Sequence, residues 1–110
     1  MELMMMSPRD RAILNEFSDQ VRQQFPDAQI WAFGSRARGD AQPDSDFDIC
    51  VVIETLNDAT WKAISAIAWS VGFEHEVLIT TIKYSRQKFE QSPCTASPLV
   101  RNILREGIAA

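Results

Sequence analysis

Two apolar runs separated by a short polar stretch constrain this chain more than any other feature of its sequence. The first run, residues 30–33, stops at Gly34 and Ser35. Ten residues later, Asp46 and Asp48 open the second run. We therefore predict a strand that ends in a tight turn and a second strand that begins with two aspartates. Because successive side chains of a strand alternate between its faces, Asp46 and Asp48 are expected to point the same way.

Two aspartates in this arrangement indicate a site for divalent cations. Their carboxylates are expected about 7 Å apart along the strand, close enough to share two ions that lie about 3.5–4 Å from each other. Hard cations such as Mg²⁺ prefer carboxylate oxygens. A third carboxylate from a neighbouring strand would complete the site, and the candidates are Glu74 and Glu76. We prefer Glu76 because it directly precedes an apolar run, as Asp48 does.

The residues around the turn are suited to phosphate binding. Gly34 permits close approach of the backbone, and Ser35 adds a hydroxyl beside backbone N–H groups. Arg36 and Arg38 could each donate two hydrogen bonds to phosphate oxygens, although ordinary surface arginines explain them equally well. Positioned donors and metal ions are what a nucleoside triphosphate needs for transfer at phosphorus. The pattern therefore predicts nucleotidyl transfer.

Size and charge exclude several classes of protein. The 110 residues fit one domain, residues 1–110, with a single core. The net charge of −4 disfavours broad nucleic-acid binding, which requires a basic surface. No apolar run approaches the ~20 residues that cross a bilayer. Cys50 and Cys94 lack the spacing of metal ligands, and their different settings favour a reducing compartment, so we expect a cytoplasmic protein.

Hydrophobic periodicity predicts alternating helices and strands. Ser7 is expected to cap a first helix that ends before Pro26, and Asn57 a second that Gly72 stops. Strands are expected over residues 29–34, 47–54 and about 74–81, and two short helices near residues 85–91 and 97–107. The expected fold class is α/β (α+β), with helices packed on a short mixed sheet of about three to four strands.

The pair Gly34-Ser35, followed by Asp46-x-Asp48, resembles the signature of the DNA polymerase β-like nucleotidyltransferase superfamily. The small size is similar to its minimal nucleotidyltransferases, including MntA-type antitoxins encoded beside HEPN-domain toxins. The resemblance implies the nucleotidyltransferase fold, ATP as substrate, two Mg²⁺ ions, and transfer of AMP to a tyrosine of a partner toxin. It also implies triphosphate binding by Gly34 and Ser35 and metal ligation by Asp46 and Asp48. The third family carboxylate, commonly Asp, falls near Glu76.

Other interpretations remain open. The protein could be an antitoxin that acts by complex formation alone, or a transferase for a small-molecule hydroxyl. Residues 84–107 carry an apolar set that either contacts a partner or a second copy, or closes the core: Phe89, Leu99, Val100, Ile103 and Leu104. His75 is expected to be structural, and Trp61 and Trp69 to lie in the core or on a partner surface rather than to stack on bases.

Overall fold

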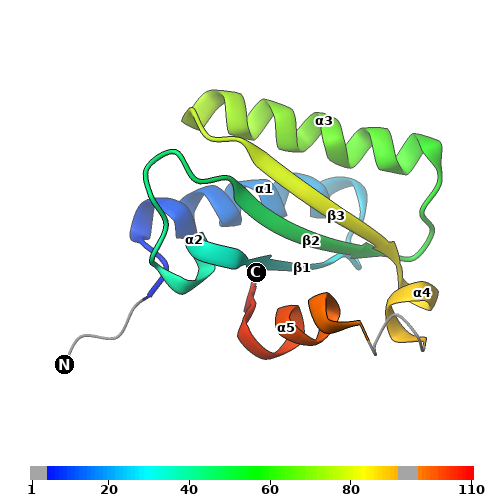
Figure 1. The fold of residues 1–110 in the computed structure, drawn as a ribbon. Helices are drawn as coiled ribbons and strands as arrows, with labels where there is room; N and C mark the ends of the chain where they lie inside the picture. Colours follow the sequence, from blue (N-terminus) through cyan, green and yellow to red (C-terminus); the bar gives the residue numbers. More distant parts are fainter. Residues whose placement is uncertain (1–4, 92–96) are drawn as a thin grey trace.

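A four-stranded mixed sheet lies between two layers of helices in the computed structural model, which describes residues 5–91 and 97–110 (Figure 1). The strands are β1 (Gln29–Phe33), β2 (Phe47–Ile53), β3 (Ile79–Ser85) and β4 (Ile108–Ala109). Their order across the sheet is β3-β2-β1-β4. β1 is antiparallel to β2 and to β4, whereas β2 and β3 are parallel. The predicted fold class and strand number are confirmed.

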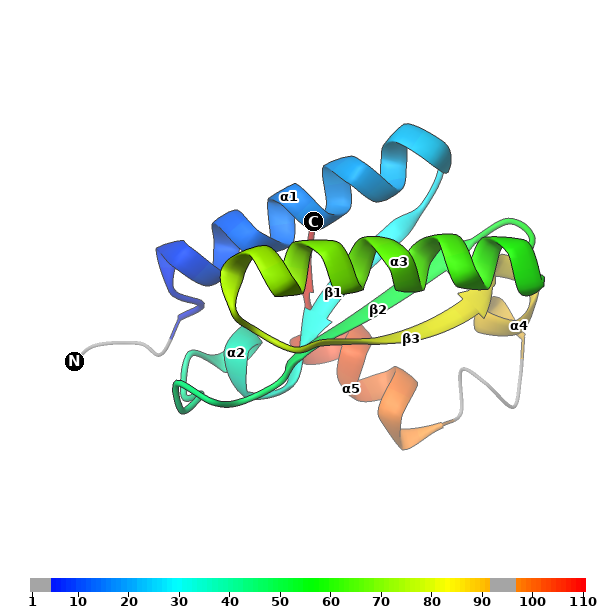
Figure 2. The ribbon, with the colours of Figure 1, turned by 90° about the horizontal axis from the view of Figure 1, so that it is seen from above.

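The helices flank the sheet on both faces, as Figures 1 and 2 show. They are α1 (Pro8–Gln24), α2 (Gly34–Arg38), α3 (Asp58–His75), α4 (Arg86–Glu90) and α5 (Pro98–Glu106). α1 and α3 cover one face, and α4 and α5 cover the other. Ser7 caps α1 as predicted, since its hydroxyl accepts the backbone N–H of Asp10 at 3.1 Å. Asn57 caps α3 in a reciprocal capping box with Thr60.

Alternation along β2 divides the core between the two faces of the sheet. One cluster joins α1 and α3 to the β2 residues Phe47, Ile49, Val51 and Ile53. The other contains Cys50 and Val52. Because Asp48 has the same parity as Cys50, it lies on the α4 and α5 face.

The C-terminal segment mainly completes the second cluster. Phe89, Val100 and Ile103 are buried there, while Leu99 and Leu104 are exposed. Of the two interpretations left open for residues 84–107, core closure therefore holds for three of the five apolar residues. β4, only two residues long, is too short to give a sequence pattern and was not predicted.

The end of α3 and the start of β3 differ from the predicted boundaries. Gly72 was expected to stop the helix, but α3 continues to His75. Glycine at position 72 instead lets the chain after α3 pack closely against the helix, because a Cβ there would lie 2.5 Å from the carbonyl oxygen of Val77. Glu76 then ends the helix in the left-handed conformation, with φ of 56°. β3 consequently begins at Ile79 rather than near Glu74.

Two further expectations concern the cysteines and the membrane. Cys50 is buried in β2, whereas Cys94 lies outside the described residues. Within the described parts of the chain, none of the helices combines the length and apolar character needed to cross a membrane.

Candidate functional site

The turn after β1 brings Gly34 against Asp48. Phe33, the last residue of β1, pairs with Asp48 across the antiparallel ladder. Gly34 follows with φ of +76°, and a Cβ at this position would lie 2.6 Å from Asp48 Oδ2. Glycine is therefore required both by the backbone conformation and by the approach of the carboxylate. Two of the predicted site residues lie side by side.

We expect Gly34→Ala to damage this site more than it damages the fold. The positive φ should cost about 1–2 kcal/mol of unfolding free energy. The added methyl group must also displace the Asp48 carboxylate, because 2.6 Å is far inside van der Waals contact. Urea denaturation and Mg²⁺-dependent ATP binding, measured on the same preparation, would separate the two effects. Unchanged ATP affinity would show that nucleotide binding does not need this contact.

Two of the predicted metal ligands, Asp46 and Asp48, lie at the start of β2. Asp46 immediately precedes β2 and is exposed, while Asp48 is partly buried. Thr80, the register partner of Asp48 on β3, donates its hydroxyl to Asp48 Oδ1 at 2.6 Å. This hydrogen bond fixes one carboxylate oxygen and leaves Oδ2 beside Gly34. Thr80 was not among the predicted site residues, because its position depends on the pairing of β3 with β2.

Glu76 does not stand in the third strand. The prediction placed it there beside Asp48, but it is the exposed C-cap residue of α3. β3 reads Ile-Thr-Thr-Ile-Lys-Tyr-Ser and has no carboxylate to face β2. The residue opposite Asp48 is therefore a threonine. Metal ligation by Glu76 stays a prediction.

Arg36 is a structural residue of the turn. Its side chain is 5% exposed, and its Nη1 forms an ion pair with the buried Asp10 at 3.0 Å. Nε and Nη2 donate to the carbonyl oxygens of Ser45 and Pro43. These contacts tie α1, α2 and the loop before Asp46 together. Because the guanidinium donors are engaged within the chain, the structure gives no support to the predicted phosphate contact of Arg36.

Unlike the buried Arg36, Arg38 is exposed enough for its guanidinium to reach a ligand. It is half-exposed, and its Nε lies 3.3 Å from the nearby Asp40 carboxylate. A hollow of about 120 Å³ beside it is lined by Phe33, Gly34, Arg38, Leu99, Asn102 and Glu106. Ser35, in the first turn of α2, is partly buried. Asn102 was not predicted as a site residue, since only the packing of α5 brings it to the turn.

A second polar cluster lies between α1 and α3. Ligand atoms of Glu16, Glu74 and His75 approach within 4.8 Å of one another. His75 Nε2 lies 2.5 Å from Glu16 Oε2. This contact links the two helices, which agrees with the structural role expected for His75. Among the described residues, this is the group of three side chains whose atoms lie close enough together to hold a metal ion. It lies on the face of the sheet opposite Asp48.

Comparisons with known proteins agree with the fold. The family model described as nucleotidyltransferase domain matches residues 14–109. A solved structure described as a toxin-antitoxin with AMP-PNP is similar, with a TM-score of 0.61 and 21% sequence identity. The similarity covers 86% of this chain and 69% of that chain. The comparison with curated proteins found no match.

Proposed function

The chain belongs to the nucleotidyltransferase domain family, and on that premise we propose that it transfers AMP from ATP to a tyrosine of a partner HEPN-type toxin. The contact between Gly34 and the Asp48 carboxylate carries this proposal. It joins a turn suited to phosphate with a carboxylate suited to a metal ion. The similar toxin-antitoxin structure with AMP-PNP supports a nucleotide and a protein partner for that fold.

The donor set fits Mg²⁺. Asp46 and Asp48 offer carboxylate oxygens on one side of the strand, and the preferred ligands of this hard cation are oxygens. Asp46 and Asp48 would hold the metal, which when bound would neutralise charge on the polyphosphate. We also propose that the site takes a second Mg²⁺ ion and that the protein is cytoplasmic.

The remaining roles follow from the turn. Gly34 allows the backbone to approach the triphosphate, and the Ser35 hydroxyl and the exposed Arg38 donate to its oxygens. The acceptor tyrosine oxygen attacks the α-phosphorus and forms a new P–O bond. The bond between the α-phosphorus and the bridging oxygen breaks, and pyrophosphate leaves with its electron pair. Asp46, which is exposed, or solvent takes the tyrosine proton.

One observation favours a second function. Thr80 occupies the β3 position opposite Asp48, so the strand supplies no third carboxylate. An antitoxin that neutralises its toxin by complex formation alone needs no complete metal site. A small-molecule acceptor gains no comparable support from the described residues.

Intact mass measurement distinguishes the two functions. The protein from the neighbouring reading frame would be incubated with this chain, ATP and Mg²⁺. An ATP analogue with a methylene group in place of the oxygen between the α- and β-phosphorus is the control for binding, because it cannot donate AMP. AMP transfer predicts a mass increase of one AMP group on that protein, on a tyrosine identified by peptide sequencing. A stable complex without the increase would support the binding function. If the partner gains no AMP group and forms no complex with this chain, both functions are contradicted.

The role of Glu76 can be tested with matched variants. Because Glu76 is the C-cap residue of α3 while Thr80 faces Asp48, we expect Glu76→Gln to keep a transfer rate close to the wild-type value when ATP and the acceptor are saturating. Glu74→Gln is the neighbouring control. A loss in Glu76→Gln as large as that in Asp48→Asn would establish Glu76 as the third ligand. A loss in Glu74→Gln alone would assign that role to Glu74.

A further inference from the structure

An exposed aromatic surface lies on the outer side of α3, away from α1. Trp69 is 70% exposed and Phe73 77% exposed, with ring centroids 6.3 Å apart. Leu78, which precedes β3, is 57% exposed. We call Trp69, Phe73 and Leu78 the α3 patch. Large apolar side chains gathered on a surface, rather than scattered singly, indicate an interaction site.

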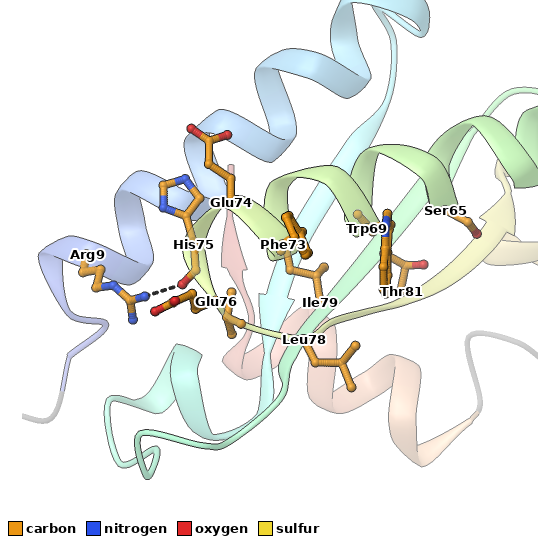
Figure 3. Close-up of a pocket in the computed structure, with 13 residues that line it drawn as sticks. Arg9, Ser65, Trp69, Phe73, Glu74, His75, Glu76, Leu78, Ile79 and Thr81 are labelled. Atoms are coloured by element: carbon orange, nitrogen blue, oxygen red, sulfur yellow. Dashed lines mark hydrogen bonds between the residues drawn. The ribbon is translucent and has the colours of Figure 1, made fainter.

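The patch borders a groove with a volume of about 780 Å³. Figure 3 shows Trp69 and Phe73 on one side of α3, and Leu78 pointing away from the helix below them. The groove also includes Thr81 of β3, an edge strand of the sheet. The aromatic rings therefore lie beside a strand edge that no other strand of the described sheet covers.

The patch reaches the candidate active site through Leu78. The Leu78 carbonyl accepts the backbone N–H of Phe47 at 2.8 Å, so Leu78 lies beside the residue between Asp46 and Asp48. In the parallel register, Phe47 pairs with Ile79, which turns Leu78 toward the same face as the aspartates. Trp69 and Phe73 lie on the α3 side of the sheet, so a protein that covers them and extends over Leu78 at the sheet edge would reach the face that carries the aspartates.

The charges beside the patch define the chemistry of its partner. Glu74 and Glu76 line the groove and are exposed. Asp46, which does not line the groove, is also exposed and precedes Phe47, the residue bonded to the Leu78 carbonyl. Arg9 also lines the groove but donates to the backbone carbonyl of His75. A segment with an apolar face flanked by lysine or arginine complements this surface. A second copy would instead bring the same carboxylates to both sides of the interface.

We propose that the α3 patch is the docking surface for the acceptor protein, which contributes an apolar segment with a basic flank. The proposal rests on the proposed function for the identity of the acceptor. It adds the surface that holds the acceptor and presents its hydroxyl at Asp46 and Asp48. Trp69 and Phe73 are the binding anchors, and they take no part in nucleotide binding.

The test uses the full chain and the purified protein from the neighbouring reading frame. We expect Trp69→Ser/Phe73→Ser to weaken their complex by about 30-fold or more, because buried aromatic anchors commonly carry 2 kcal/mol or more. ATP affinity in Mg²⁺ should stay at the wild-type value. Leu104→Ser is the matched control, since Leu104 is 51% exposed on α5. Calorimetry without nucleotide gives the affinity, and urea denaturation checks the fold.

Charge is tested separately. Glu76→Lys should weaken the complex, and rising salt should weaken the wild-type complex more than the variant. Equal affinity in wild type and Trp69→Ser/Phe73→Ser, or the absence of any complex, would overturn the proposal. Light scattering that shows a dimer dispersed by the same substitutions would also overturn it, in favour of a second copy. A complex that needs the patch but undergoes no AMP transfer would support the docking surface and contradict the catalytic function.

Discussion

Asp48→Asn is expected to reduce Mg²⁺-dependent transfer by about 100-fold or more, since loss of even a residue that supports a metal ligand commonly costs 10–100-fold. The substitution removes the charge that attracts the cation but retains an oxygen in a side chain of the same shape. That oxygen can still accept the Thr80 hydroxyl, which lies 2.6 Å from Asp48 Oδ1. The fold should therefore survive. Transfer rates measured across a Mg²⁺ titration would reveal the loss.

Asp44→Asn provides the control for charge. Asp44 is an exposed residue of the loop that precedes β2 and has no assigned role in the site. If both variants lose activity equally, a general change in surface charge is responsible rather than metal ligation. Transfer by Asp48→Asn at the wild-type rate and at the same Mg²⁺ concentration would contradict the assignment of Asp48.

The part of the site that could be predicted is local in sequence. Gly34 and Ser35 directly follow β1 and Asp48 lies in β2, so the antiparallel pairing of β1 with β2 brings Gly34 against Asp48. The apolar runs on either side are sufficient to predict the two strands and the turn, and the structure adds their pairing. The same reasoning predicted the helix caps at Ser7 and Asn57, which depend on residues only three positions away.

The errors occur where distant contacts decide local structure. Gly72 is a typical helix terminator in sequence, but here it makes room for the Val77 carbonyl, and α3 continues past it. This shift moves Glu76 out of the strand and puts Thr80 opposite Asp48. Arg36 was predicted to bind phosphate because it follows Gly34 and Ser35 in the turn. Its buried partner Asp10 is 26 residues away and could not be identified from spacing.

The exposed face of α3 was recognised only in part. Trp61 and Trp69 were assigned to the core or to a partner surface; Trp69 is largely exposed and Trp61 is half-exposed. Helical periodicity places apolar residues on a face but does not show whether another element covers that face. Partner contact was sought instead in residues 84–107, where most of the apolar side chains prove to be buried.

Arg36→Ala is expected to lower the unfolding free energy by about 3–5 kcal/mol, because it leaves the buried carboxylate of Asp10 without a partner. Asp10 is 6% exposed, so its charge depends on the guanidinium as its partner. The carbonyls of Ser45 and Pro43 lose their donors as well, which should loosen the loop that leads to Asp46. Urea denaturation would measure the stability, and ATP affinity would report on the loop.

A double variant that removes the charges of both Asp10 and Arg36 separates the effect of the ion pair on stability from the effect of the loop contacts. In Asp10→Asn/Arg36→Met no charge stays buried, so the double variant should be more stable than Arg36→Ala, while the Ser45 and Pro43 carbonyls still lack donors. We therefore expect stability to recover in part and ATP affinity to remain low. If the double variant is no more stable than Arg36→Ala, the unpaired Asp10 charge is not the source of the loss. If Arg36→Ala instead folds normally and fails only in nucleotide binding, Arg36 contacts phosphate after all, and the structural role assigned to it is wrong.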